Sequence, residues 1–270
     1  MDNTADRPSQ AGATDSPATA WFRFYEELND FLPLARRKTC FPCPVTRRAS
    51  IKDAIEALGV PHTEIDLILV NGESVDFSHI VNSGDRISVY PMFESVDIRP
   101  LLKLRPEPLR HSKFVLDTHL GRLARYLRML GLDVLYRNDF GAEELATLSC
   151  TEQRILLTRD RRLLHRSIIT RGYYIRSNDP VQQVTEVLRR FDLYASLEPM
   201  SRCIRCNGTL SDTDKKKILD RLEPKTARHY DHFRSCNACG QIYWKGSHFD
   251  KMEQLIARFR EPAAETGHSR

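Results

Sequence analysis

Two cysteine pairs in the last third of the chain constrain its fold most strongly. Each pair has the CxxC spacing, and the four residues are Cys203, Cys206, Cys236 and Cys239. Two such pairs bring four thiolates to one tetrahedral site of the kind that Zn²⁺ prefers. The 29 residues between the pairs exceed the usual gap, so they must include an extra turn or helix, and His229 or His232 could replace one cysteine as a ligand. The sequence therefore predicts a structural zinc ribbon over residues 199–258.

The composition excludes a membrane protein and a secreted disulfide scaffold. Of the 270 residues, 41% are hydrophobic and 29% are charged. No apolar run approaches the roughly 20 residues that a membrane helix needs, and the N-terminal segment contains no apolar stretch of the signal-peptide type. Six of the seven cysteines lie in CxxC pairs, which favours metal or redox chemistry over disulfide bonds. We therefore expect a cytoplasmic protein that has no membrane partner.

Strand and helix patterns alternate over residues 113–198. Apolar segments typical of strands occur at residues 113–117, 133–136, 154–158 and 173–176. Segments with helical spacing of apolar residues follow them, at residues 120–130, at 142–149, from 158 to about 166, and at 180–190. Such alternation predicts an α/β fold with a doubly wound parallel sheet.

An aspartate ends or follows each of the four predicted strands. These residues are Asp117, Asp139, Asp160 and Asp179. In a parallel sheet the carboxyl ends of the strands meet at one edge, where the four carboxylates would hold one or two Mg²⁺ or Mn²⁺ ions that activate water. Aspartate is also favoured at the start of a helix, and each of the four precedes a predicted helix, so capping is the alternative. Glu143 or Glu144 could take the place of Asp139.

Basic residues lie beside the predicted acidic site. The candidates for contact with nucleic acid are Arg122, Arg125 and Arg128 on one helix, Arg159, Arg161 and Arg162 around the third aspartate, and Trp244 and Lys245 after the last cysteine pair. The first 100 residues hold 10 basic and 15 acidic residues, whereas residues 101–270 hold 31 and 21. This asymmetry favours a polyanionic partner for the basic part. An ordinary solvated surface is the alternative for the arginines, and a place in the ribbon core is the alternative for the tryptophan.

Residues 20–97 predict a smaller α+β domain, with a helix over residues 51–58. Residues 67–91, LILVNGESVDFSHIVNSGDRISVYP, resemble the β-grasp domains of ubiquitin-like and sulfur-carrier proteins in their order of strand, Asn-Gly turn and Gly-Asp before the last strand. Carriers end in a free Gly-Gly tail, which this segment lacks, so we expect a binding or scaffolding role. The pair Cys40 and Cys43 could bind metal, undergo redox chemistry or remain free thiols.

Four segments of the basic part together resemble the ribonuclease domain at the carboxyl end of the Mut-seven exoribonucleases. The segments are FVLDTHLGRLARYLRMLGLDVLY, RILLTRDRRLL, CIRCNGTL and CNACGQIYWKGSHFDKM, and the resemblance covers about residues 112–258. It implies a PIN-like, metal-dependent ribonuclease with an appended zinc ribbon, a ubiquitin-like domain ahead of it, and Asp117 and Asp160 in the acidic cluster. Asp139 and Asp179 match positions that vary among PIN-like domains. No exonuclease domain precedes these segments, so we expect an endonuclease.

The expected organisation has three folded parts. The boundaries are a disordered tail at 1–19, a ubiquitin-like β-grasp domain at 20–97, a linker at 98–112, a PIN-like nuclease domain at 113–198, a zinc ribbon at 199–258 and a second tail at 259–270. The expected function is a Mg²⁺- or Mn²⁺-dependent ribonuclease whose zinc ribbon assists RNA binding. The alternative is a non-catalytic RNA-binding or adaptor protein whose β-grasp domain recruits a protein partner.

Overall fold

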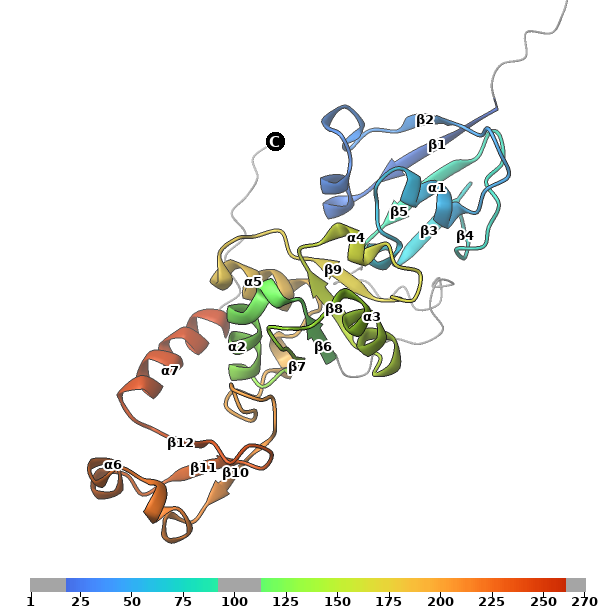
Figure 1. Ribbon diagram of the computed structural model, residues 1–270. Coiled ribbons are helices and arrows are strands. Elements are labelled where there is room, and N and C mark those ends of the chain that lie inside the picture. The colour runs from blue at the N-terminus through green and yellow to red at the C-terminus, as the bar shows by residue number, and fades with distance from the viewer. Residues whose placement is uncertain (1–17, 92–112, 261–270) are drawn as a thin grey trace, which may run out of the picture.

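The computed structural model describes residues 18–91 and 113–260 of the chain. The predicted linker at residues 98–112 and most of both predicted tails lie outside the described residues. Three sheets follow one another along the described chain, each in its own part of the molecule (Figure 1).

The N-terminal sheet has five strands in the order β2-β1-β5-β3-β4. Its elements are β1 (Thr19–Phe24), β2 (Phe41–Pro44), α1 (Ile51–Ala57), β3 (Leu67–Val70), β4 (Glu73–Ser74) and β5 (Arg86–Tyr90). Strands β1 and β5 pair in parallel and the other pairs are antiparallel, which is the arrangement of a β-grasp domain. Because side chains alternate along β1, Phe22 and Phe24 are buried in the core with Ile51 of α1, whereas Trp21 is 41% exposed. Ser50 caps α1 by accepting a hydrogen bond from the Asp53 amide at 3.1 Å.

The middle sheet is parallel throughout, with the strand order β7-β6-β8-β9. Its strands are β6 (Lys113–Leu116), β7 (Asp133–Leu135), β8 (Ile155–Thr158) and β9 (Gly172–Tyr174), and its helices are α2 (Gly121–Met129), α3 (Ala142–Thr151), α4 (Arg161–Leu164) and α5 (Pro180–Arg190). Phe114 and Leu116 pack in the core with α2 and α5, while Val115 packs with α3 and α4. Helices therefore cover both faces of the sheet, which confirms the predicted α/β fold.

The C-terminal sheet has three antiparallel strands in the order β10-β11-β12. These are β10 (Leu210–Thr213), β11 (Phe233–Cys236) and β12 (Ile242–Trp244), and α6 (Pro224–His229) lies between β10 and β11. Helix α6 and the short turns beside it account for the unusually long gap between the two cysteine pairs.

The last helix, α7 (Ser247–Arg260), is not among the elements expected from the sequence. It leaves the C-terminal sheet and returns to the middle domain beside α2 (Figure 1). Ile256 and Phe259 are buried in the core of the middle domain, and the ring centroids of Phe259 and Tyr126 are 5.8 Å apart. The helix thus holds the C-terminal part against the middle domain and extends into the region expected to begin the second tail.

The N-terminal and middle domains also pack directly against each other. The fully buried Glu64 carboxylate accepts a hydrogen bond from the Tyr174 backbone N–H and lies 3.5 Å from the Arg176 guanidinium. Arg176 also donates from Nε to Asp30 at 2.8 Å. Burial raises the pKa of Glu64, and the neighbouring arginines oppose that shift. These contacts join the N-terminal domain to the side of the middle domain where β9 and α4 lie.

Candidate active site and metal centre

Asp117 lies directly after β6, at the carboxyl end of a central strand of the parallel sheet. The residue is only 7% exposed. The Thr158 hydroxyl, at the end of β8, donates to Asp117 Oδ2 at 2.7 Å, and the Thr118 hydroxyl donates to Oδ1 at 3.1 Å. The carboxylate makes no capping hydrogen bond to the short helix that follows. The capping alternative therefore does not describe Asp117, whose side chain is oriented instead by a hydroxyl from the neighbouring strand.

Asp160 follows β8 and is joined to Asp117 through Thr158. The Asp160 backbone N–H donates to the Thr158 hydroxyl at 2.9 Å, and that hydroxyl donates in turn to Asp117. The Asp160 carboxylate caps α4 by accepting from the Arg162 amide at 2.9 Å, and the Arg162 side chain lies 3.3 Å away. Burial acts to raise the pKa of Asp160, but the hydrogen bonds and charge of Arg162 have the larger effect. The net result is a lowered pKa, which favours the ionised carboxylate. Thr158 is absent from the predicted site; the signal for it is a single polar residue at the end of an otherwise apolar strand.

Asp139 and Asp179 lie after the two outer strands and have other partners. Asp139 is exposed and accepts from Arg137 Nε at 2.8 Å and Nη2 at 3.0 Å. Asp179 Oδ1 accepts from the amides of Val181 at 3.0 Å and Gln182 at 2.9 Å, so it caps α5. The capping alternative thus describes Asp179 well and Asp160 in part.

The six predicted arginines have different surroundings. Arg122 and Arg125 are exposed on α2, and neither has a partner among the residues that the structure describes. Arg128, the third candidate on this helix for contact with nucleic acid, is not on this exposed face, because it is only 3% exposed. Its guanidinium donates to backbone carbonyls of β7, at Val134, and of the cysteine-bearing loop, at Arg205, with distances of 2.9 and 3.0 Å. Arg128 therefore connects the middle domain to the C-terminal part.

The three arginines around Asp160 also differ. Arg159 donates to the backbone carbonyls of Arg176, at 3.3 Å, and of Ser177. Arg161 lies over the rings of Phe31 and Tyr174, 5.0 and 5.1 Å from their centroids, and so contacts the N-terminal domain. The third arginine, Arg162, is exposed beside Asp160. Of these three, Arg162 has the placement most suited to an added polyanion.

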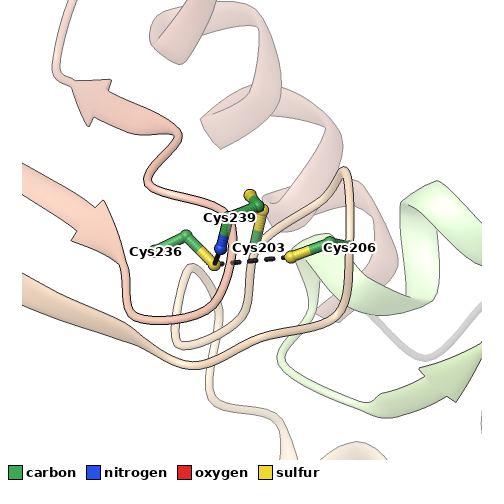
Figure 2. Close-up of side chains that lie close together, drawn as sticks. All are labelled: Cys203, Cys206, Cys236 and Cys239. Atoms are coloured by element: carbon green, nitrogen blue, oxygen red, sulfur yellow. Dashed lines mark hydrogen bonds between the residues drawn. The ribbon is translucent and has the colours of Figure 1, made fainter.

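The four cysteines predicted to bind metal converge (Figure 2). Their sulfur atoms all lie within 4.8 Å of one another, with 3.7 Å between Cys203 and Cys239 and 3.4 Å between Cys206 and Cys236. A tetrahedral zinc site with Zn–S bonds of about 2.3 Å requires sulfur separations of about 3.8 Å. Among the side chains that the structure describes, this is the only group of three or more His, Cys, Asp or Glu residues placed to hold a metal ion. The spacing of the four thiols therefore fits zinc. The four aspartates do not form a group of comparable spacing.

The sulfur atoms of the cluster have different electrostatic surroundings. Burial raises the pKa of Cys206 to about 12. Burial also acts to raise the pKa of Cys236, but the amides of Cys239 and Ala238 lower it to about 7. Zinc binding would displace the protons that remain on the thiols. A Cβ at Gly208 would lie 2.8 Å from Cys236 Sγ, so the first knuckle has no room for a larger residue there. His229 and His232 are not among the four clustered ligands.

The N-terminal cysteine pair forms no such knuckle. Cys43 lies in strand β2 and Cys40 directly precedes it. Residues three apart in an extended strand point to opposite faces of the sheet. Cys40 is exposed and Cys43 is half-buried, and burial raises the pKa of Cys43. Their placement is that of two separate thiols.

Two family models match the chain. The Mut7-C RNAse domain model matches residues 112–256, which is more than half of the chain, and the Mut7-C ubiquitin model matches residues 17–97. No curated protein and no solved structure matches it. Among the described helices, none has the length and apolar character needed to cross a bilayer. The chain therefore belongs to the Mut7-C RNAse domain family, and a Mut7-C ubiquitin domain precedes its RNAse domain.

Proposed function

We propose that the chain is a metal-dependent ribonuclease that cuts RNA phosphodiester bonds at the carboxyl edge of its parallel sheet. The observation that carries the proposal is the buried Asp117 carboxylate at the end of a central strand, within a domain of an RNAse family. In open α/β sheets this edge is where ligands bind. Carboxylate oxygens supplemented by water and phosphate are the ligands that Mg²⁺ and Mn²⁺ prefer, so the donor set fits either ion.

A divalent ion at this edge would supply a Lewis acid and an activated water molecule. Asp117 and Asp160 would hold the ion, and the Thr158 hydroxyl orients Asp117 by donating to its carboxylate. Asp139 and Asp179 would add carboxylates from the outer strands, and Asp139 would have to leave Arg137 to do so. The chemistry supplied would be hydrolysis, in which a water oxygen would bond to phosphorus, the bond to the sugar oxygen would break, and the proton lost by the water would end on that sugar oxygen. We expect these cuts to be internal.

Exposed cations next to this edge support a nucleic-acid substrate. Arg122 and Arg125 belong to the helix that begins just after Asp117, and they have no partner in the described part of the chain. An arginine guanidinium can bind two phosphate oxygens at once, which would position the strand over Asp117. Zinc-bound cysteines would stabilise the ribbon, which in this proposal holds RNA beyond the cleavage site. Thiolate ligands persist in a reducing compartment, which supports a cytoplasmic location.

The test is cleavage of a 5′-labelled structured RNA, and of the DNA of the same sequence, by the full chain. Reactions contain Mg²⁺, Mn²⁺ or no added divalent ion. We expect RNA fragments only when an ion is present, and internal fragments at the earliest times. Binding without cleavage in every reaction would contradict the proposal and favour the non-catalytic adaptor.

Asp179 offers a way to separate capping from catalysis. Asparagine caps a helix about as well as aspartate but carries no charge. Asp179→Asn should therefore keep α5 and the folding stability intact. A loss of cleavage in this variant, with unchanged thermal unfolding, would place Asp179 in the metal site, whereas full activity would assign it to the cap alone.

A further inference from the structure

A pocket of about 440 Å³ lies in the C-terminal part of the molecule, away from the aspartates at the sheet edge. Its walls come from the ribbon strands β10, β11 and β12 and from the start of α7. Its aromatic lining is formed by Phe233, Tyr243, Trp244 and Phe249. A volume of several hundred Å³ with a mostly apolar wall and a few polar groups is typical of a small-ligand site.

Contacts hold the Trp244 side chain in place at this pocket, while part of the side chain stays exposed to solvent. It is 38% exposed, although it belongs to a strand. The ring centroid of Phe233 lies 6.4 Å away at a tilt of 51°. A Cβ at Gly246 would lie 2.9 Å from the indole nitrogen, so the glycine lets the chain turn closely against the indole edge. Trp244 is therefore a preformed flat platform rather than a loose surface side chain.

The charges around the pocket decide what kind of group can enter it. Three carboxylates line it, Asp212, Asp214 and Asp231, and they outnumber the two cations that pair with them, Arg234 and Lys215, which disfavours a phosphate inside. Arg234 is committed to the fold, because it donates to the Met200 carbonyl at 2.7 Å and lies 3.3 Å from Asp212.

Lys245 has a different position from Arg234. It is exposed, lies 5.4 Å from the Phe249 ring centroid and has no carboxylate partner in the described chain. An uncharged aromatic group can stack on Trp244, while a phosphate attached to that group stays outside near Lys245.

We propose that this pocket binds one unstacked base of single-stranded RNA, with the base on Trp244 and its phosphate at Lys245. The inference deepens the proposed ribonuclease function, because it gives the ribbon a means to hold the strand apart from the cleavage site. Aromatic stacking accepts any base, so this site would grip RNA without reading a sequence.

The two tryptophans of the chain provide the test. Trp21→Phe leaves Trp244 as the single tryptophan, and Trp244→Phe leaves Trp21, which is similarly exposed in the N-terminal domain. Both full-length proteins, loaded with zinc and without Mg²⁺ or Mn²⁺, are titrated with hexa-adenylate and with inorganic polyphosphate. We expect saturable quenching of Trp244 by hexa-adenylate, no quenching by polyphosphate, and no change at Trp21.

Binding of dye-labelled hexa-adenylate, measured by fluorescence anisotropy, completes the test. Trp244→Leu should weaken it about tenfold, the fold-change expected for loss of one base stack, while Trp21→Leu should leave it unchanged. Binding with no quenching of Trp244 and no effect of Trp244→Leu would overturn the base site and leave the ribonuclease proposal standing. Equal quenching by polyphosphate, or neither binding nor quenching, would also overturn it. Quenching in a protein that cuts no RNA would uphold the base site and refute the ribonuclease.

Discussion

Replacing Arg128 by methionine should destabilise the middle domain by about 3 kcal/mol and weaken zinc binding. Arg128 is 3% exposed and donates hydrogen bonds to four backbone carbonyls. Two belong to the middle domain, Val134 at 2.9 Å and Tyr136 at 3.3 Å, and two belong to the first cysteine knuckle, Ile204 at 3.3 Å and Arg205 at 3.0 Å.

The size of the expected loss of stability depends on which of the four carbonyl acceptors can bind water once Arg128 is removed. A hydrogen bond from a charged donor contributes about 1.5–3 kcal/mol, and a buried acceptor left unpaired costs about 1–3 kcal/mol. Only the bond to the Val134 carbonyl is buried, whereas the other three acceptors are part-buried and can regain water. We therefore count the one buried bond at the upper end of these ranges, which gives about 3 kcal/mol. Loss of the bonds to the knuckle should lower zinc affinity by about tenfold or more, as for other groups that orient metal ligands.

The assay is denaturant unfolding of the full chain with zinc bound, together with zinc affinity by competition with a chelator. Arg125→Met is the matched control, since Arg125 lies one helical turn earlier with no partner in the described chain, and it should change stability by less than about 0.5 kcal/mol. For RNA affinity we expect Arg125→Met to have the larger effect of the two variants, because it removes an exposed cation and should weaken the complex. Unfolding of Arg128→Met within about 0.5 kcal/mol of wild type would refute the assigned role.

Two other predictions concern the zinc site and the domain interface. Cys203→Ser should lower the zinc content below one ion per chain and reduce solubility. The control is Cys150→Ser, which removes a thiol outside the cluster and should change neither. An unchanged zinc content of Cys203→Ser, measured by atomic absorption, would exclude Cys203 as a ligand. Glu64 has a raised pKa in the folded chain, so its stabilising contribution is complete below its unfolded pKa of about 4.3 and is lost as the pH rises through the folded pKa. Glu64→Gln should therefore match wild type at acid pH and become the more stable protein at higher pH; a difference that does not change with pH would contradict this reasoning.

Local patterns in the sequence were enough to predict the elements of the middle domain. The Asp179-Pro180 pair marks the start of α5, and the observed bounds Pro180–Arg190 agree with the predicted helix. Leu123 and Leu127 belong to the helically spaced apolar residues of the predicted helix 120–130, and both are buried. The cysteine spacing likewise predicted the four-sulfur cluster, because a chelating knuckle is itself a local structure.

Contacts between distant segments could not be predicted in this way. At 100° per residue, Arg128 lies about 120° around α2 from Arg122, and two of its four acceptors belong to a loop more than 70 residues later. Distant segments also contact Arg161, which faces the N-terminal domain, and α7, whose apolar face is covered by the middle domain. The aspartates follow their strands as predicted. However, the Asp179 carboxylate caps α5 and the Asp139 carboxylate pairs with Arg137, and the sequence pattern did not distinguish these contacts from a metal site.

The most direct test of the central claim is the rate of RNA cleavage by Asp117→Asn in the presence of Mg²⁺ or Mn²⁺. Asparagine keeps the size of the side chain and an oxygen that can accept from Thr158, so folding and zinc content should match wild type. Asp192→Asn, at an exposed position beyond α5, is the control and should cleave at the wild-type rate. The proposed site predicts at least a hundredfold loss in Asp117→Asn. Cleavage by Asp117→Asn at the wild-type rate would contradict the account.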